Sequence, residues 1–421
     1  MSFQTRFEKV LALADALEQN KERIVEFAVK DLQFTVKDSV REVELAISRL
    51  PMYDQARPML EPRVHLGGAG ACVPLMLSYN GSAWLNTAIT SIYMVGNRVR
   101  VKFSSRGRNL MALTESIYRP IFGDDISFYS GRGRSFMEES LRDPQVAAVV
   151  VFGFDENILP YENAFRESGK KLIFEGPGQD PFIVLPDASL ESTLDDLVAS
   201  KFMYSGQTCT APKRIFIHET IYDEVVDRLA ERARSLVVGD PADSRTDISP
   251  VASPVAVERV RAQLADAVAK GAIVVCGGNV EGLLVAPTVV RNCTDDMLGM
   301  REEVFAPVAF TSSFSSVSEV LTRARNHKYG LRAAVHGTAS AEEVVRGLKG
   351  AAYCHPVRSY TYGKFGTVAH NQPRSESWKG AFVTKAVGGY GLSGWIWETV
   401  GGRFRIKQGP KLFSLETSAL A

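Results

Sequence analysis

The spacing of hydrophobic residues changes near residue 67. Before it, apolar residues recur every three or four positions, in runs from Phe7 to Leu17, Ile24 to Leu32 and Val40 to Leu50. That period is typical of amphipathic helices, which pack one face against a core. We therefore predict two or three packing helices that end near Pro51, since proline lacks the backbone N–H that a helix needs.

After residue 67, short β-branched segments alternate with helical ones. The predicted strands are 70–77, 98–103, 125–131, 147–153 and 170–176, and helical stretches such as 86–95, 109–122 and 162–169 separate them. This alternation predicts a parallel, doubly wound sheet. Ligands bind beyond the carboxyl ends of such strands. The residues that follow each strand are therefore the first candidates for chemistry.

A second region of strands and helices runs from 182 to about 326, which indicates a second α/β unit. The stretch 355–387 that comes later is polar, basic and aromatic, without clear periodicity. The tail from 403 to 416 is typical of one or two short strands.

Composition narrows the function classes. A chain of 421 residues has room for two or three domains. The net charge of +1 argues against binding to nucleic acid or to an acidic membrane surface, and no apolar run reaches the roughly 20 residues of a membrane span. The five cysteines are scattered, with no CxxC pair, so we expect neither a disulfide framework nor a metal site. Together with a charged N-terminus unlike a signal peptide, this predicts a cytoplasmic protein.

One cysteine stands out by its neighbours. Cys209 lies in the segment 202–214, FMYSGQTCTAPKR, among small and polar residues that leave the sulfur reachable. An attacking thiolate needs that access. Taken by composition alone, the segment fits a chance cysteine in a loop better than a reactive one.

Four segments resemble the aldehyde dehydrogenase superfamily, and the resemblance runs from about Leu66 to Gly394. Segment 202–214 is similar to the family's F-x-x-x-G-Q-x-C-x-A-x-x-R at every fixed position. Segment 302–308, EEVFAPV, resembles E-E-[IV]-F-G-P-V with alanine in place of glycine. Segments 326–335, NHKYGLRAAV, and 388–394, GGYGLSG, resemble N-x-x-Y-G-L-x-A-x-V and G-G-[FY]-x-x-S-G. The chain is thus identified as a short, divergent member of this NAD(P)-dependent family.

The resemblance implies three catalytic residues. Cys209 matches the nucleophile, which forms a thiohemiacetal with the aldehyde and then a thioester. Glu175, in LIFEGPG, matches the general base of L-E-L-G-G-K. Asn80, in SYNGS, matches the asparagine of P-W-N-F-P, whose amide stabilises the oxyanion together with the backbone N–H of Cys209. The implied activity is oxidation of an aldehyde to a carboxylic acid.

The resemblance also implies a site for NADP or NAD. Lys102 matches the lysine of K-P-S-E, which holds the adenosine ribose or its phosphate, while Glu303 and Phe305 match the residues beside the nicotinamide. Ser105 replaces the glutamate of K-P-S-E, and Arg106 follows it. Loss of that acid makes NADP at least as well suited as NAD, because an acid there would repel a 2′-phosphate.

The pyrophosphate turn of the family, F-T-G-S-T-x-x-G, is poorly kept. Only Gly153 survives in the segment 151–158, VFGFDENI, which also carries two acidic residues. Two alternatives therefore stay open beside aldehyde oxidation. One is a coenzyme A-acylating reductase, which does not require Glu175. The other is a degenerate member that acts as a binding subunit.

The expected organisation is a cofactor-binding domain with the N-terminal helices over 1–176, a catalytic domain over 177–395, and a tail over 396–421 for assembly into a homodimer or homotetramer. Of two places that match the family's G-x-V-x-V-N turn, 350–356 is favoured over 366–371. That choice makes 355–387 an insertion over the substrate entrance. Its cations could receive an acidic aldehyde or a nucleotide-like thiol carrier, or could simply be solvated: Arg358, Lys364, His370, Arg374 and Lys379.

Overall fold

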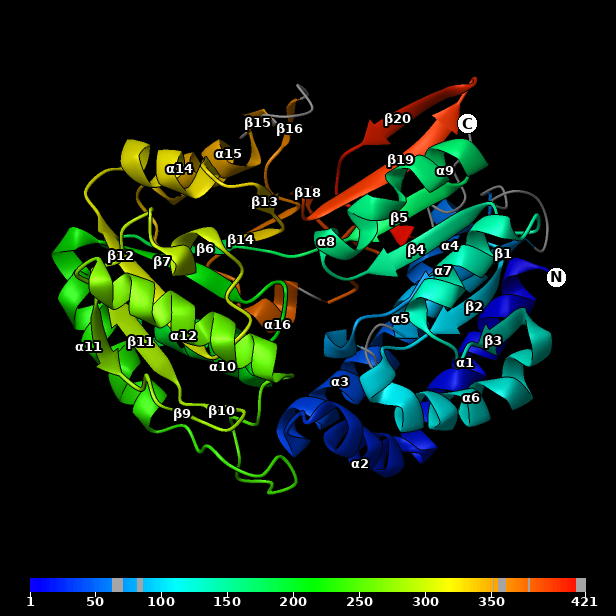
Figure 1. Ribbon diagram of the computed structural model, residues 1–421, viewed down its shortest axis with the longest axis horizontal. Coiled ribbons are helices and arrows are strands. Elements are labelled where there is room, and N and C mark those ends of the chain that lie inside the picture. The colour runs from blue at the N-terminus through cyan, green and yellow to red at the C-terminus, as the bar shows by residue number, and fades with distance from the viewer. Residues whose placement is uncertain (63–70, 82–85, 351, 355–360, 378, 414–421) are drawn as a thin grey trace.

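Two seven-stranded sheets lie side by side in the computed structural model, which describes residues 1–62, 71–81, 86–350, 352–354, 361–377 and 379–413 (Figure 1). The strand order is β20-β19-β5-β4-β1-β2-β3 in the first sheet and β17-β14-β6-β7-β12-β11-β8 in the second. The predicted α/β class with two doubly wound sheets is confirmed.

The first sheet contains the five predicted parallel strands. They are β1 (Cys72–Met76), β2 (Arg98–Lys102), β3 (Ile126–Phe128), β4 (Ala148–Phe152) and β5 (Lys171–Glu175). The strand order reverses between β1 and β4, and the crevice at such a switch point is where ligands bind in open α/β sheets.

Side chains alternate between the faces of this sheet, as a strand requires. Ala148 and Val150 of β4 join the core formed with the N-terminal helices and with α5 (Asn86–Met94) and α6 (Arg108–Phe122). Val149 and Val151 join a core on the opposite face, with α7 (Gly133–Arg142) and α9 (Glu162–Ser168). Both faces are thus covered, which explains the continuous apolar run of β4.

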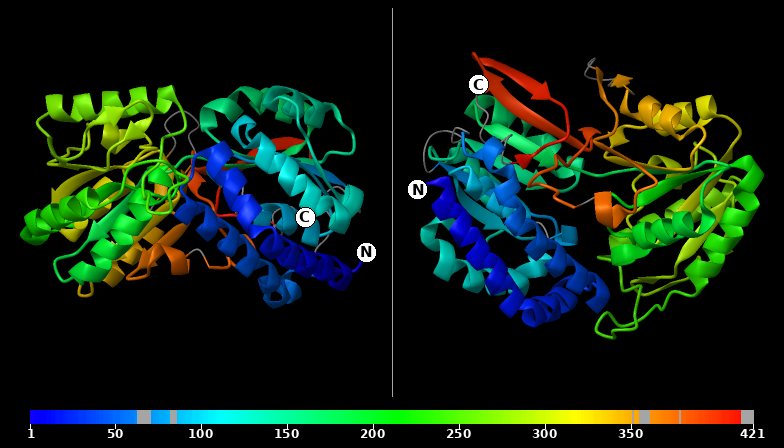
Figure 2. Two further views of the ribbon diagram at one scale, coloured as in Figure 1. Left: turned by 90° about the horizontal axis from the view of Figure 1, so that it is seen from below. Right: turned by 180° about the vertical axis from the view of Figure 1, so that it is seen from behind.

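The N-terminal helices cover α6 and reach the second half of the molecule (Figures 1 and 2). They are α1 (Phe3–Gln19), α2 (Lys21–Leu32), α3 (Val36–Arg49) and α4 (Tyr53–Leu60). The helix predicted to end near Pro51 gives way there to a 3-10 turn, after which α4 continues the helical path. At the start of α3 the backbone N–H of Val36 donates to the carbonyl of Pro241, 3.1 Å away. This contact ties α3 to the second half.

The second sheet is parallel except for one edge strand, β8. Its strands are β6 (Asp180–Val184), β7 (Pro212–His218), β8 (Ile273–Cys276), β11 (Thr288–Arg291), β12 (Val308–Phe314), β14 (Arg332–His336) and β17 (Thr367–His370). Helices α10 (Leu190–Phe202) and α11 (Tyr222–Arg234) pack on one face. The other face is covered by α12 (Pro254–Ala269), α14 (Val317–Arg325) and α15 (Ala341–Lys349). Six further short elements connect or flank these: α8 (Asp155–Ile158), α13 (Leu298–Arg301), the hairpin of β9 (Val280–Glu281) with β10 (Leu284–Val285), and β13 (Tyr329–Gly330) paired with β18 (Tyr390–Gly391).

The tail returns to the first sheet. Strand β19 (Gly394–Val400) pairs antiparallel with β5, and β20 (Arg403–Lys407) pairs with β19 at the edge of the sheet. Of the one or two short strands predicted over 403–416, the described residues contain β20, whereas β19 precedes that segment. Within this chain both strands extend the first sheet. Oligomerisation through the tail stays a prediction.

The preferred place for the G-x-V-x-V-N turn is wrong. Residues 367–370, in the second of the two candidate segments, form β17, which runs parallel to β14 in the second sheet. Residues 352–354, in the first, form β15 (Ala352–Cys354), which among the described residues pairs with β16 (Thr361–Gly363) in a separate two-stranded sheet. The sequence favours the first segment because a helix precedes it. Pairing with β14 shows instead that the second segment forms the strand of the sheet. The prediction that all of 355–387 is an insertion is therefore also wrong, since residues 367–370 belong to the second sheet.

Candidate active site

Cys209 lies in the loop between α10 and β7, at the carboxyl side of the first sheet. The loop begins with three successive residues in the left-handed region, Tyr204 (φ 52°), Ser205 (φ 54°) and Gly206 (φ 70°). Such angles are costly for the first two residues and persist only where surrounding contacts fix them.

Contacts from three sides fix this turn. The backbone N–H of Tyr204 donates to Asp38 of α3 (2.8 Å), and the Ser205 hydroxyl donates to the carbonyl of Ser249 (2.9 Å). At Gly206 a Cβ atom would lie 2.1 Å from the carbonyl oxygen of Ala306. Glycine is therefore required there for close approach as well as for its φ angle.

Two buried cations support the loop around the cysteine. Lys213 Nζ donates to the carbonyls of Thr208 and Cys209, and the Arg374 guanidinium donates to the hydroxyls of Thr208 (3.1 Å) and Thr210 (2.7 Å). Burial raises the pKa of the Cys209 thiol to about 12, and the field of Lys213 opposes this rise. A thiol in such surroundings needs a base to become a nucleophile.

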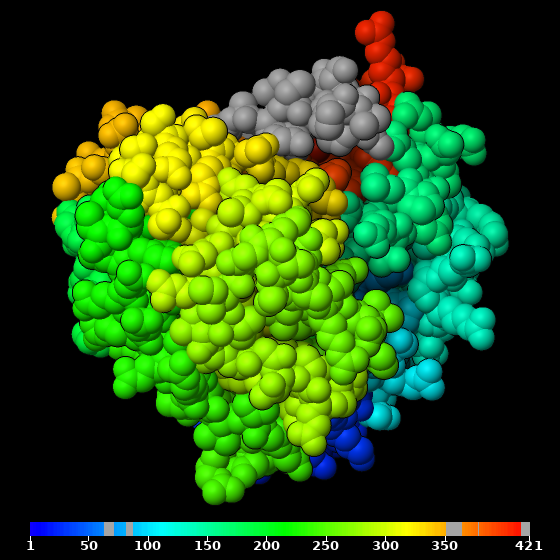
Figure 3. Space-filling view, turned by 60° about the vertical axis from the view of Figure 1, so that its left-hand side comes forward, coloured from blue at the N-terminus to red at the C-terminus, as the bar shows by residue number. Residues whose placement is uncertain are grey.

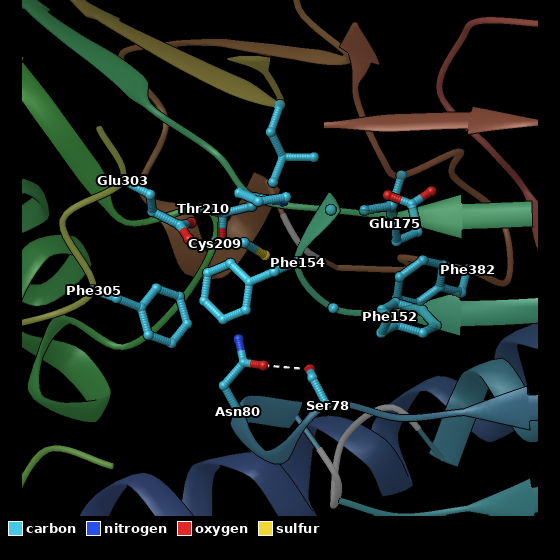
Figure 4. Close-up of a pocket in the computed structure, with 15 residues that line it drawn as sticks. Ser78, Asn80, Phe152, Phe154, Glu175, Cys209, Thr210, Glu303, Phe305 and Phe382 are labelled. Carbon is cyan, nitrogen blue, oxygen red and sulfur yellow. Dashed lines mark hydrogen bonds between the residues drawn. The ribbon is translucent and has the colours of Figure 1, made fainter. Parts of the chain in front are cut away.

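Cys209 stands where two cavities meet. A narrow cavity of about 70 Å³ contains all three predicted catalytic residues, Asn80, Glu175 and Cys209, together with the predicted cofactor residues Gly153, Glu303 and Phe305 (Figure 4). A wider cavity of about 420 Å³ reaches Cys209 and Asn80 from the other side. The structure thus brings together residues that lie up to 225 positions apart, from Asn80 to Phe305.

Asn80 follows β1 in a short turn. Its side-chain oxygen accepts a hydrogen bond from the hydroxyl of Ser78, which leaves the amide nitrogen directed toward Cys209 (Figure 4). This orientation presents an N–H donor to the space beside the sulfur, as an oxyanion site requires. This contact, through which Ser78 orients Asn80, was not predicted from the sequence.

Glu175 ends β5 and its side chain is 7% exposed. Its carboxylate lies at the other end of the narrow cavity from the Cys209 sulfur (Figure 4). Burial raises the pKa of Glu175 to about 8, against the opposing field of Lys411. A carboxyl group with a pKa near neutrality is suited to general base catalysis.

Glu303 is buried and lines the narrow cavity. Its Oε1 accepts the backbone N–H of Gly178 (3.0 Å) and lies 3.6 Å from Lys213 Nζ. Its Oε2 is buried and has no hydrogen-bond partner within the described residues. An orphaned carboxylate oxygen on a cavity wall is a ready acceptor for a ligand hydroxyl.

Aromatic side chains surround the cofactor turn. The ring of Phe305 meets those of Tyr79 and Phe154 edge-on, with centroids 6.1 and 6.0 Å apart. The helix after the turn, α8, has only four residues, and its first turn carries Asp155 and Glu156. The turn therefore offers a weak anion site, as the sequence indicated, and Phe154 occupies space beside Phe305 instead of a small residue.

The remaining predicted cofactor residues follow or end β2 and are not among those that line the narrow cavity. Figure 3 shows the surface where the two halves of the chain meet. Lys102 is buried and donates to the carbonyl of Phe103 (3.1 Å), whereas Ser105 is exposed. Arg106 lies over the ring of Tyr79 and donates to the carbonyl of Ala252, which bridges the two halves. A cavity of about 130 Å³ bounded by Tyr79, Phe154 and Phe305 separates this region from the narrow cavity.

The basic residues of 355–387 lie in different surroundings. Arg374 begins the short helix α16 (Arg374–Ser377) and lines the wider cavity, so it is the one of the described four that reaches the site. Lys364 is fully buried, and burial lowers its pKa to about 6. His370 contacts the carbonyl of Gly337, and Lys379 is exposed. Arg358 lies outside the described residues.

Comparison with known proteins agrees with this geometry. Residues 1–395 match the Aldehyde dehydrogenase family. The chain belongs to the aldehyde dehydrogenase family. A succinate-semialdehyde dehydrogenase [NADP(+)] of Mycobacterium avium is 30% identical to this aldehyde dehydrogenase over 349 residues, 78% of this chain and 74% of that protein. A second enzyme of that description, from Mycobacterium bovis, is 36% identical over 198 residues, 46% of this chain and 43% of its own length.

Solved structures show the same fold. An oxidoreductase from Marinobacter aquaeolei superposes with a TM-score of 0.85 at 24% identity, over 99% of this chain and 85% of that one. The NAD⁺ complex of an aldehyde dehydrogenase from Bacillus cereus gives 0.83 at 22% identity, over 99% and 83%. The predicted family, enzyme class and NAD(P) dependence of this aldehyde dehydrogenase are thus confirmed. Among the described helices, none is long and apolar enough to cross a bilayer.

Proposed function

We propose that the protein oxidises an aldehyde that carries a second, acidic group to the carboxylic acid, with Cys209 as nucleophile, Asn80 as oxyanion donor and Glu175 as general base. The observation that carries this proposal is the position of Cys209 between two cavities. The narrow one holds the base and the nicotinamide-side residues, and the wide one opens toward Arg374. Aldehyde and cofactor can therefore approach the sulfur from opposite sides.

Acylation begins with loss of the thiol proton. Glu175 accepts this proton through a water in the narrow cavity, and the thiolate adds to the aldehyde carbon. The resulting oxyanion receives N–H bonds from Asn80 and the backbone of Cys209. Bound NAD(P) supplies an acceptor for the hydride, and loss of that hydride leaves a thioester on Cys209.

Hydrolysis completes the cycle. Glu175 first releases the thiol proton to solvent. It then takes a proton from water, which adds to the thioester carbon, and the same two N–H donors hold the second oxyanion. Collapse of this adduct breaks the carbon–sulfur bond and releases the acid. Cys209 leaves as the thiolate and regains a proton from the base.

The residues present fit a dinucleotide at its nicotinamide end. The orphaned Oε2 of Glu303 would accept a ribose hydroxyl, and Phe305 would flank the ring. Lys102, Ser105 and Arg106 would hold the adenosine end. Because Ser105 is uncharged and Arg106 is near, we infer a preference for NADP over NAD, in keeping with the cofactor named for the M. avium relative.

Replacing Ser105 by glutamate is expected to reverse this preference. A carboxylate here would repel a 2′-phosphate but could accept a ribose 2′-hydroxyl, so the Kd for NADP should rise about tenfold or more relative to that for NAD. Titration of both cofactors by intrinsic fluorescence measures the change. Ser105→Gln is the matched control, with similar size and no charge. Equal effects of both variants on both cofactors would remove Ser105 from the adenosine site.

The acidic substrate class rests on the wider cavity. Arg374 lines it near Cys209, and Arg41 of α3 stands at its exposed side. The acids of the same cavity both have partners: the exposed Asp195 pairs with Arg232, and the buried Asp196 contacts His336. A positive field therefore remains for a carboxylate of the substrate, and the relatives are named for succinate semialdehyde.

Replacing Arg41 by methionine tests the substrate class. The KM for succinate semialdehyde is expected to rise about two- to fivefold, a small factor because the side chain is largely exposed. The KM for butanal, which has the same chain length without the acid, should stay unchanged. Lys37→Met, on the same helix but outside the cavity, is the control. A parallel change for both aldehydes would contradict a role in charge recognition.

The organisation of the chain completes the proposal. We assign 1–176 to the cofactor half, 177–395 to the catalytic half and 396–421 to the tail, in a cytoplasmic homodimer or homotetramer. Free thiols at Cys72, Cys209, Cys276 and Cys293 support a reducing compartment. The outer edge of β20, with alternate residues exposed, supports assembly by strand pairing.

A further inference from the structure

After β20, the C-terminal segment Gly409–Phe413 runs along residues that line the narrow cavity. The backbone of Lys411 exchanges two hydrogen bonds with Val387, at 2.8 and 2.5 Å. Two residues later the buried ring of Phe413 stacks on Phe382, with centroids 4.8 Å apart and an interplanar angle of 14°. Since Val387 and Phe382 both line the narrow cavity, the segment is anchored to its wall.

This anchoring places a lysine beside the base. Lys411 Nζ lies 3.9 Å from Glu175 Oε1, and the two side chains are 1% and 7% exposed. The ammonium also donates to the carbonyl of Gly389 (3.4 Å). At Gly388 a Cβ would lie 2.2 Å from Glu175 Oε1, so the carboxylate packs directly against a backbone that allows no side chain.

Among the residues that the structure describes, Lys411 is the charge that acts on Glu175. Its neighbour in the sheet, β4, has no charged residue, and the acid of β19, Glu398, pairs with Arg405 and Lys171. Glu175 Oε1 has no hydrogen-bond donor within the described residues. A buried carboxylate without donors is costly to ionise, so a nearby cation has a large effect on its charge state.

We propose that Lys411 is a positioning residue that favours the ionised form of the Glu175 carboxylate and fixes it against Gly388, so that the C-terminal segment completes the active site. This inference rests on the proposed role of Glu175 as general base. Lys411 does not contact the sulfur; it acts through the carboxylate. Burial and the lysine oppose each other, and their balance sets the pKa of Glu175 at about 8.

Lys411→Met tests this role through the pH dependence of kcat. Removing a cation at this distance should move the acid limb of the profile about 1 to 3 pH units toward alkaline pH, because the carboxyl group then holds its proton more tightly. Lys411→Arg should restore the limb to within about half a unit, since it keeps the charge. Lys407→Met, an exposed lysine on β20, is the matched control and should leave the profile unchanged.

The position of the limb does not depend on how much of the protein is folded, so partial loss of folded Lys411→Met still gives an answer. A limb that stays at the wild-type pH, with only a lower maximum, would overturn the proposal and leave Lys411 as a packing residue. Glu175→Gln, measured in parallel, separates the two claims. If that variant keeps both rate and acid limb, the base assignment itself fails. If it loses the limb while Lys411→Met matches wild type, only the role of Lys411 fails.

Discussion

Replacing Cys209 by alanine is expected to lower kcat for aldehyde oxidation by roughly 10⁴-fold or more, because no other group can form the thioester. The structure supports this expectation through the position of the sulfur, which is half-buried and lines both cavities. Steady-state production of reduced cofactor measures the loss. Binding of NADP should survive the change, since the thiol is not among the residues expected to hold the cofactor.

Two other cysteines provide the controls. Cys276 lies on β8 and Cys293 follows β11, and both thiols are buried in hydrophobic clusters of the second sheet. Alanine at either position should leave kcat within about threefold of wild type, with a small loss of stability from the missing atoms. Comparable losses across all three variants would mean that Cys209 has no special role.

Replacing Glu175 by glutamine is expected to slow steady-state turnover by about 10²- to 10⁴-fold, the range typical of a lost general base. Glutamine keeps the shape of the side chain but cannot take a proton from water. Because glutamine cannot accept the thiol proton either, both half-reactions should slow. Where hydrolysis slows more than acylation, the acyl group accumulates on Cys209 and rapid mixing shows a burst of reduced cofactor. Gas chromatography of the acid product checks that turnover and reduction of the cofactor agree.

The pH dependence of the wild-type enzyme follows from the same residue. The pKa of Glu175 is raised to about 8, so the carboxyl group is charged above this pH and protonated below it. Activity should fall as the pH drops through about 8, and the limb should disappear in Glu175→Gln. Full activity of that variant, dependent on added coenzyme A and giving a thioester product, would instead support the acylating alternative, which does not need the base.

Much of the fold follows from local patterns. Strands such as β4 and β5 are short runs of β-branched and aromatic residues bounded by turn signals. Both faces of these strands are buried, so their apolar residues are continuous along the sequence. The segment 366–371 could not be placed in the same way. Its membership of the second sheet depends on pairing with β14, a contact between distant parts of the chain that no local pattern reveals.

The residues of the candidate site also differ in whether the sequence alone could reveal them. Segments that match family motifs supplied Cys209, Asn80 and Glu175, and the structure brings them to one cavity. Arg41 escaped notice because it lies on an amphipathic helix that looks purely structural. Lys411 escaped because the tail has no motif, and only its return along Val387 brings it to the base.

The cofactor turn is the largest departure from the family pattern. Burial raises the pKa of Asp155, and its carboxylate accepts the hydroxyl of Tyr329 (3.0 Å), so this acid is engaged inside the protein instead of facing a phosphate. Phe154 packs between Phe305 and the guanidinium of Arg259. These contacts reduce the charge conflict that the sequence indicated and favour an enzyme over a degenerate binding subunit.

The most direct test is to locate the acyl group. Glu175→Gln mixed with succinate semialdehyde and NADP, quenched in acid within the burst and digested, should yield a peptide acylated at Cys209 in mass spectrometry. The amount of acylated peptide should equal the reduced cofactor formed in the burst. Reduced cofactor without any acyl group on Cys209, or an acyl group on another cysteine, would contradict the account.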